Sequence, residues 1–257
     1  MVVSTRRINY EGRCYGSTIC GEKKVKKIVR RSKTKLQSLS RDLLVDVLGR
    51  VAASSFTDVF NAKLSCQDFL DAVEDDYIFQ NISMEKFQII PWFQQSDSEI
   101  SFLTNCLNKG NPEALFRQGV RCLVLQIEYF QLVKVGSGLR YLKMAAEKGH
   151  PEATYVYGMI MLARGGEPGQ QALSLLNSMY SRLGDSKICE CREKFKSVLG
   201  ILWVRNKISV EEVNFKCQKR NHVNNVRRMN FDEDEEILKC DSCMWSRKLN
   251  AFCKFFK

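Results

Sequence analysis

The sequence contains few features that would direct it into a membrane or across one. It has no apolar run close to the roughly 18 residues that a membrane-spanning helix needs, and only four prolines occur among its 257 residues. The first residues, Met1-Val-Val-Ser-Thr-Arg-Arg7, lack the apolar stretch of about 7–15 residues found in secretory signals. We therefore expect neither a membrane span nor a secretory signal.

Motifs for catalysis are missing as well. No Ser/His/Asp or Cys/His/Asn set has a spacing that would support nucleophilic chemistry. Gly165-Gly166 followed by Glu-Pro-Gly is typical of a turn rather than of a phosphate-binding loop. His150 takes the place in one copy of a repeat that Asn111 has in the other, so a capping role fits it better than chemistry. The sequence predicts a non-catalytic protein.

The eleven cysteines are scattered and odd in number. In a chain of this length, such a set favours a reducing compartment over a disulfide framework. We expect the protein in the nucleus, the cytoplasm or both.

The net charge of +11 is concentrated near the start of the chain. Residues 1–35 hold eleven Lys and Arg against two Glu, which leaves 29 basic and 27 acidic groups for all the rest. Like charges packed this densely repel one another, so we predict a disordered basic tail over 1–35. It serves either as a nuclear-import signal or phosphate-binding arm, or only for solubility. The nearly neutral remainder makes a broad nucleic-acid-binding surface unlikely on charge grounds.

A repeat occupies the middle of the chain. Gly110-Asn-Pro-Glu-Ala114 returns 39 residues later as Gly149-His-Pro-Glu-Ala153. A period near 40 with helical patterning is typical of stacked helix–turn–helix units. The same offset aligns further pairs: Leu103 with Leu142, Cys106 with Ala145, Leu107 with Ala146, Lys109 with Lys148, Phe116 with Tyr155, and Gly119 with Gly158.

The repeated residues predict how each unit turns. Gly110 and Gly149 end a helix in the left-handed conformation, and Pro112 and Pro151 open the next one. A glutamate then follows in the first turn, where the helix dipole favours it. The arrangement resembles the Sel-type relatives of the tetratricopeptide repeat, which implies protein binding; the helices could equally form only a core. We predict helices at 99–109, 113–126, 138–148, 152–163, 170–181 and 186–204.

Shorter helices are expected before the repeat. Apolar residues recur at helical spacing from Leu39 to Val51, and Ser55 followed by Asp58 predicts the capped start of a second helix. Ser40 is expected to cap the first helix by accepting a hydrogen bond from a first-turn N–H. Periodicity alone favours an ordinary amphipathic helix packed in a core.

The stretch from Leu39 to Phe69 nevertheless resembles an F-box, the helical module that docks on the Skp-type adaptor of a cullin ubiquitin ligase. Leu39, Asp42 and Leu43-Leu44 match its opening, while Ser40 stands where an F-box usually has proline. The resemblance implies an adaptor-binding face, with Leu43 and Leu44 as its anchors. The residues expected to bury against the adaptor are Leu39, Leu43, Leu44, Val47, Leu48 and Val51.

Cysteines cluster again near the end. Cys217-x4-His222 and Cys240-x2-Cys243 could together close a tetrahedral zinc site, with Cys253 as a substitute for His222. With so many cysteines, a single CxxC pair is a weak signal. A structural zinc ion is therefore a possible cofactor, and no other cofactor is indicated.

From about residue 36 to the end, the order of these parts resembles a group of plant F-box proteins. The resemblance rests also on Arg50-Val-Ala, Lys63-Leu-Ser-Cys66, Pro91-Trp92 and Tyr155-Val-Tyr-Gly158. It implies an all-α substrate receptor that binds a Skp-type adaptor and cullin complex and recruits a protein target. The alternatives are a nuclear zinc-dependent nucleic-acid-binding protein and a repeat scaffold without a ligase role. We predict a basic tail (1–35), an F-box-like module (36–75), helical repeats (76–184) and a helix with a Cys-rich region (185–257).

Overall fold

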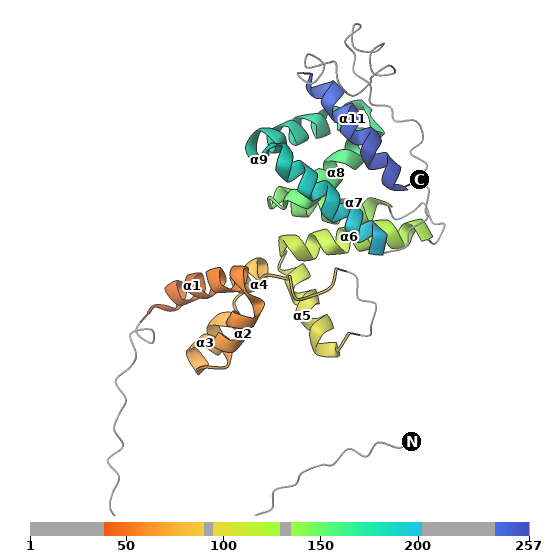
Figure 1. Cartoon of the computed structure of the whole chain (residues 1–257). Helices are drawn as coiled ribbons and strands as arrows, with labels where there is room; N and C mark the ends of the chain where they lie inside the picture. Colours follow the sequence, from red (N-terminus) through yellow and green to blue (C-terminus); the bar gives the residue numbers. More distant parts are fainter. Residues whose placement is uncertain (1–38, 90–94, 129–134, 202–239, 257) are drawn as a thin grey trace, which may run out of the picture. The chain divides into compact units, whose positions relative to one another are not determined.

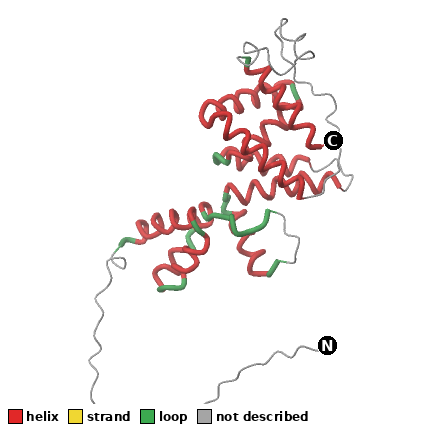
Figure 2. The backbone as a smooth tube through the Cα atoms, viewed as in Figure 1, coloured by secondary structure: helices red, strands yellow, loops and turns green. Residues whose placement is uncertain are grey.

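The computed structural model describes residues 39–89, 95–128, 135–201 and 240–256, and every regular element among them is a helix (Figures 1 and 2). The predicted all-α fold is confirmed. None of these described helices has the length and hydropathy of a bilayer-spanning segment. The helices are α1 (Arg41–Ser54), α2 (Phe56–Lys63), α3 (Gln67–Val73), α4 (Asp76–Asn81), α5 (Asp97–Asn108), α6 (Pro112–Glu128), α7 (Val135–Glu147), α8 (Pro151–Arg164), α9 (Gly166–Ile201) and α11 (Asp241–Cys253), followed by the short 3-10 helix η2 (Lys254–Phe256).

Helices α1 to α4 pack around one apolar cluster. Ser55 caps α2 as predicted, since its hydroxyl accepts a hydrogen bond from the Asp58 N–H at 3.2 Å. Each of these helices is too short to be stable alone, so the shared cluster holds them together. The cluster extends into α5 and the start of α6. Its buried members are Leu44, Leu48, Ala52, Val59, Ala72, Val73, Ile78, Ile82, Met84, Cys106 and Ala114.

The predicted capping bond at Ser40 is wrong. Ser40 is the N-cap residue of α1 and has an extended backbone, but its side chain accepts no cap hydrogen bond. Its carbonyl begins the helical ladder by accepting from the Leu44 N–H at 3.0 Å. Asp42 in the first turn complements the helix dipole. The helix therefore starts at the expected place without the hydroxyl.

The two repeat turns have the same backbone geometry. Gly110 and Gly149 have φ of 80° and 83°, the left-handed conformation that glycine adopts without strain. After each glycine, the next N–H closes the turn on a carbonyl five residues earlier: Asn111 on Cys106 at 2.9 Å, and His150 on Ala145 at 3.1 Å. This pairing is the Schellman pattern of helix ends. The predicted helix–turn–helix repeat is confirmed.

Gly119 and Gly158 allow the next helix to approach closely. A Cβ atom at Gly119 would lie 2.9 Å from the Leu142 side chain, and one at Gly158 would lie 2.7 Å from that of Leu176. Leu142 of α7 and Leu176 of α9 lie 34 residues apart, each in the helix that follows the glycine-bearing one. Close helix crossings are therefore present at equivalent places, between α6 and α7 and between α8 and α9.

Helix α9 contains a kink at Gly184, where φ is 77° and ψ is 173°. The kink separates two helical segments, as the sequence predicts. The predicted turn after α8 is shorter than expected, because only Gly165 and Gly166 have positive φ. Glu167, Pro168 and Gly169 already lie in the first turn of α9. Proline is compatible with that position, since first-turn N–H groups have no partner within the helix.

The C-terminal helix α11 completes the second apolar cluster. Trp245, Leu249 and Phe252 are buried against residues of α6 to α9. The Trp245 indole N–H donates to Asn177 Oδ1 at 2.6 Å, and Asn177 Nδ2 donates to Asp241 Oδ2 at 3.1 Å. Part of the predicted Cys-rich region is therefore an integral helix of the repeat core.

The described residues from Leu39 to Phe256 belong to one compact unit. The predicted boundary at 75/76 lies between the Asp75 cap and α4, and the one at 184/185 lies at the kink in α9. The predicted basic tail over 1–35 and the Pro91-Trp92 pair lie outside the described residues.

Candidate docking face and junction cavity

The apolar residues of α1 point in two directions. Leu44 and Leu48 are 6% and 4% exposed and lie in the cluster of α1 to α4, and Val51 packs half-buried against the same cluster. Leu43 and Val47 are 55% and 45% exposed. The apolar stripe is wider than the cluster can cover, so part of it faces outward.

The structure thus sorts the six residues predicted to bind an adaptor. Leu39, Leu43 and Val47 are exposed, whereas Leu44 and Leu48 are core residues of the module. Leu43 and Leu44, expected to act together as anchors, lie on different sides of the helix because neighbouring helical residues diverge. Only Leu43 of that pair is available to a partner.

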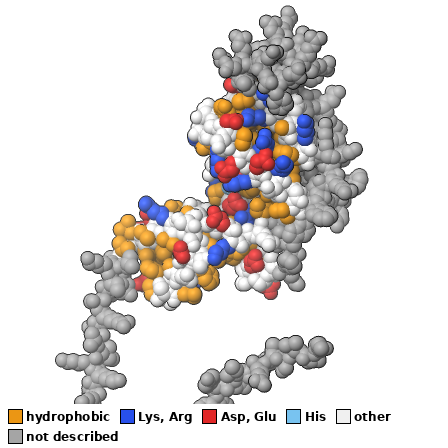
Figure 3. Space-filling view, viewed as in Figure 1, with side chains coloured by type: hydrophobic (Ala, Val, Ile, Leu, Met, Phe, Trp, Pro, Cys, Tyr) orange, Lys and Arg blue, Asp and Glu red, His pale blue; other side chains and the backbone are white. Residues whose placement is uncertain are grey.

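Further apolar side chains of the same module are exposed. Phe60 of α2, Leu64 just after it and Tyr77 of α4 are exposed, Leu64 to 73%. Six of the nine exposed large hydrophobic residues among those described thus belong to the region of α1 to α4. Orange side chains gather over the start of α1 in Figure 3. We call Leu39, Leu43, Val47, Phe60, Leu64 and Tyr77 the docking face. Such a concentration of exposed apolar groups marks an interaction surface.

Asn111 joins the first repeat turn to the module before it. Its Oδ1 accepts from the N–H groups of Glu113 and Ala114, capping α6. Its Nδ2 donates to the carbonyls of Phe79 and Ile82, both at 3.0 Å. One amide therefore caps a helix and closes the end of α4. Sequence reasoning found the cap but had no signal for the second pair of bonds.

His150, in the equivalent place of the second turn, joins that turn to the first repeat. Its Nδ1 accepts from the Ala153 N–H at 3.2 Å, so α8 is capped by a ring nitrogen. The ring proton then lies on Nε2 and donates to Glu113 Oε2 at 2.7 Å. The ring also stacks on Phe116, with centroids 4.8 Å apart. The predicted capping role of His150 is confirmed.

The side chains of Arg117 and Lys194 complete this network of contacts. Arg117 binds Glu113 Oε1 at 2.6 Å, and its other nitrogens donate to the carbonyls of Phe87 and Met84. Lys194 of α9 binds Glu152 Oε1 at 2.8 Å. The glutamate of the first turn is thus held by a side chain one helical turn later, and that of the second turn by a side chain of α9. The spacing of Glu113 and Arg117 is a local sequence signal, whereas no short sequence pattern signals Lys194.

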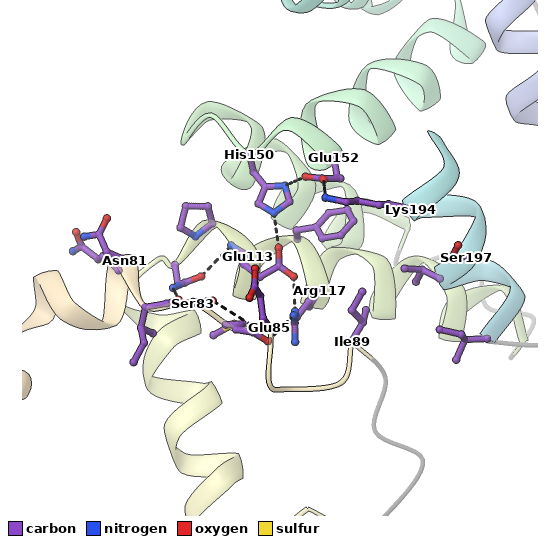
Figure 4. A pocket seen from close by; sticks show the side chains of 18 residues that line it. Asn81, Ser83, Glu85, Ile89, Glu113, Arg117, His150, Glu152, Lys194 and Ser197 are labelled. Atoms are coloured by element: carbon purple, nitrogen blue, oxygen red, sulfur yellow. Dashed lines mark hydrogen bonds and ion pairs between the residues drawn. The ribbon is translucent and has the colours of Figure 1, made fainter. Parts of the chain in front are cut away.

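These groups line a cavity of about 650 Å³. Figure 4 shows Glu113 between His150 and Arg117, with Glu152 and Lys194 on the adjoining wall. The opposite wall is formed by residues 80–85 and Ile89, from the last turn of α4 and the segment after it. The cavity therefore lies where the α1–α4 module meets the repeats, and we call it the junction cavity.

The electrostatics of Glu113 make stability depend on acid pH. Burial would raise the pKa of Glu113, but the His150 hydrogen bond and the Arg117 charge and hydrogen bond lower it from 4.5 to about 2. Because the folded-state pKa is depressed, the stabilisation is present above the unfolded pKa and is lost as pH falls from about 4.5 to about 2. We expect Glu113→Gln to flatten the fall in melting temperature over that interval.

Thermal unfolding followed by circular dichroism from pH 6 down to pH 2 would measure this effect. Glu85→Gln is the matched control, because Glu85 lines the same cavity without an ion pair to a described residue. Some pH dependence remains in the variant, since Lys248 also lowers the pKa of Asp185. A wild-type slope in Glu113→Gln would contradict the role of this carboxylate.

The predicted zinc ligands are only partly within the structure. Cys240 and Cys243 are buried at the start of α11, while Cys217 and His222 lie outside the described residues. Cys253 is ten residues after Cys243 on one helix, a separation of about 15 Å along the axis. Cys253 therefore cannot share a metal ion with Cys243. The described residues hold no group of three metal-binding side chains, and zinc stays a prediction.

The fold and these contacts define a helical-repeat protein with a small helical module, carrying exposed apolar side chains, in front of the repeats. Residues 84–200 match the family of plant tetratrico peptide repeats. The match begins in the segment that lines the junction cavity and ends near the close of α9. The predicted tetratricopeptide-like repeat region is therefore confirmed.

Two proteins of Arabidopsis thaliana are similar to the chain over longer stretches. F-box protein At1g67623 is 34% identical over 192 residues, which cover 72% of this chain and 62% of the relative. F-box protein At2g35280 is 27% identical over 144 residues, 56% of this chain and 83% of the relative. The chain thus spans less than two thirds of the first relative's length. No solved structure matches the chain. The resemblance to plant F-box proteins with a repeat region is confirmed.

Proposed function

We propose that the chain is the substrate-recognition subunit of a cullin-type ubiquitin ligase. The docking face binds a Skp-type adaptor, and the repeats with α11 bind a protein target. The subunit performs no chemistry itself. It raises the effective concentration of target lysines near the conjugating enzyme.

The observation that carries this proposal is the exposed apolar side of α1 to α4. The module already has a complete core, yet Leu43, Phe60 and Leu64 remain in solvent. Solvent exposure of such groups is unfavourable by roughly 1.5–3 kcal/mol for each side chain that a partner could bury fully. A partner helix or groove would therefore gain substantial free energy here, and the similarity to F-box proteins supports a Skp-type adaptor as that partner.

The remaining cysteines fit the proposed nuclear or cytoplasmic location. Burial raises the pKa of the Cys106 and Cys191 thiols to about 12, so both are unreactive. Cys66, Cys122 and Cys189 are also free thiols. A reducing compartment suits such a set.

The decisive experiment combines Leu43→Glu and Val47→Glu in the full chain. Both side chains are exposed, so we expect an unchanged circular dichroism spectrum and melting temperature. Two charges placed in an apolar interface should weaken binding to a purified plant Skp-type adaptor by at least about 100-fold, measured by calorimetry.

Ile100→Glu is the matched control, because Ile100 is similarly exposed but lies on α5, outside the docking face. This variant should bind the adaptor like the wild type. If wild-type chain fails to bind the adaptor, or if the double variant binds it equally well, the proposal is wrong.

A further inference from the structure

The junction cavity has more acid than its own cations neutralise. Glu85, Glu113 and Glu152 line it, against Arg117 and Lys194. His150 accepts the Ala153 N–H through Nδ1 and contacts Glu113 through Nε2. The lining therefore holds three carboxylates against the two side chains that are always positively charged.

Arg117 and Lys194, the positively charged side chains that line the cavity, already bind other groups of the chain. Arg117 directs its nitrogens at Glu113 and at two carbonyls. Lys194 lies between two carboxylates, Glu152 at 2.8 Å and Glu190 at 3.0 Å. The start of α6 is capped by Asn111 and that of α8 by His150, so neither helix end offers its dipole freely to an anion.

The carboxylates of Glu152 and Glu85 have fewer partners within the chain than these positive groups have. Glu152 Oε1 receives Lys194, but Oε2 lies 3.4 Å from His150 Nδ1, whose lone pair already accepts the Ala153 N–H. The only close partner of Oε2 among the described residues is thus the His150 ring, and the Glu152 side chain is 9% exposed. Glu85, on the opposite wall, is exposed and makes no ion pair with a described side chain. A cationic ligand would add a charge-assisted hydrogen bond at either carboxylate.

The rest of the cavity wall is largely apolar. Ile201, at the end of α9, is 46% exposed, and Ile89 on the facing segment is half-buried. Lysine and arginine combine a charged end with an aliphatic stem, and they bury that stem along apolar surface. An apolar wall beside the carboxylates of Glu85 and Glu152 matches this kind of side chain.

We propose that the junction cavity binds a basic-apolar peptide segment of the target protein. A Lys or Arg side chain points toward Glu152 and Glu85, and the stem and a neighbouring apolar residue lie against Ile89 and Ile201. A volume of about 650 Å³ suits several side chains rather than a folded domain. The identification of the peptide as part of a ligase target rests on the proposed function; the binding chemistry does not.

Selection of a random seven-residue peptide library on the purified full chain tests the proposal. We expect enriched peptides to carry Lys or Arg beside an apolar residue. One enriched peptide is then labelled and titrated by fluorescence anisotropy. Glu85→Lys and Ile201→Glu should each weaken its binding at least tenfold, and their combination should abolish it.

Glu74→Lys and Ile100→Glu are the matched controls, since both residues are exposed and lie outside the cavity. Acidic or purely apolar selected peptides, no enrichment, or equal binding to the cavity variants would each overturn the proposal. All four variants should bind the Skp-type adaptor normally. Failure of peptide binding is thus distinguishable from failure of the ligase function, which the docking-face variants test.

Discussion

Trp245→Ala should reduce the free energy of unfolding of the repeat region by about 3–5 kcal/mol, the range for a large aromatic residue removed from a core. The Trp245 side chain is fully buried, and its ring meets Tyr180 edge-on. The change also removes the donor to Asn177, which leaves that amide oxygen without its 2.6 Å partner. For a chain of this size the melting temperature should fall by roughly 6–20 °C. Differential scanning calorimetry would measure the shift.

Two further substitutions on α11 make this expectation specific. Asn250→Ala, at an exposed position, should leave the melting temperature within about a degree of wild type, because surface changes rarely matter. The melting temperature of Trp245→Phe should lie between those of Trp245→Ala and Asn250→Ala, since phenylalanine keeps a ring but loses the N–H. A melting temperature unaffected by Trp245→Ala would mean that α11 is not part of the core.

Leu48→Ala should destabilise the α1–α4 module by about 2–5 kcal/mol, the usual cost of a cavity left by a buried leucine. Leu48 is 4% exposed in the apolar cluster that α1 to α4 share. Urea unfolding followed by circular dichroism would show the loss as a lower midpoint with an unchanged slope.

Leu43→Ala provides the matched comparison, as the same substitution on the same helix at a side chain that is 55% exposed. Its effect on the unfolding midpoint should be within about 0.5 kcal/mol. The order should reverse for adaptor affinity. Once the affinities are corrected for the fraction of folded protein, Leu43→Ala should bind the adaptor more weakly than Leu48→Ala. Equal destabilisation by the two variants would refute the inward and outward assignment of α1.

The repeat could be predicted from the sequence because its signals are local. A glycine with left-handed backbone followed by an N-cap and proline defines a helix end and a helix start within five residues. Gly119 and Gly158 added the positions of close helix contact, which the structure confirms. The capping role of His150 followed from its alignment with Asn111.

Other features depend on contacts between residues distant in the sequence, so no local sequence pattern predicts them. Helical spacing identified the apolar stripe of α1 but could not tell which part faces the core, because α2, α3 and α4 decide that. The docking of α11 depends on Trp245 reaching Asn177, 68 positions earlier. The junction cavity likewise combines segments near residues 85, 113, 150 and 194. Only the folded chain brings these groups together.

The repeat turns also give the array a fixed order. Asn111 and His150 cap their helices in the same way, but each uses its remaining nitrogen on a different neighbour. The Asn111 amide binds two backbone carbonyls, whereas the His150 ring binds a carboxylate. An amide and an imidazole at these places bind unlike groups, so each turn is matched to the particular segment that it contacts. Similar sequences in the two copies therefore do not make them interchangeable building blocks.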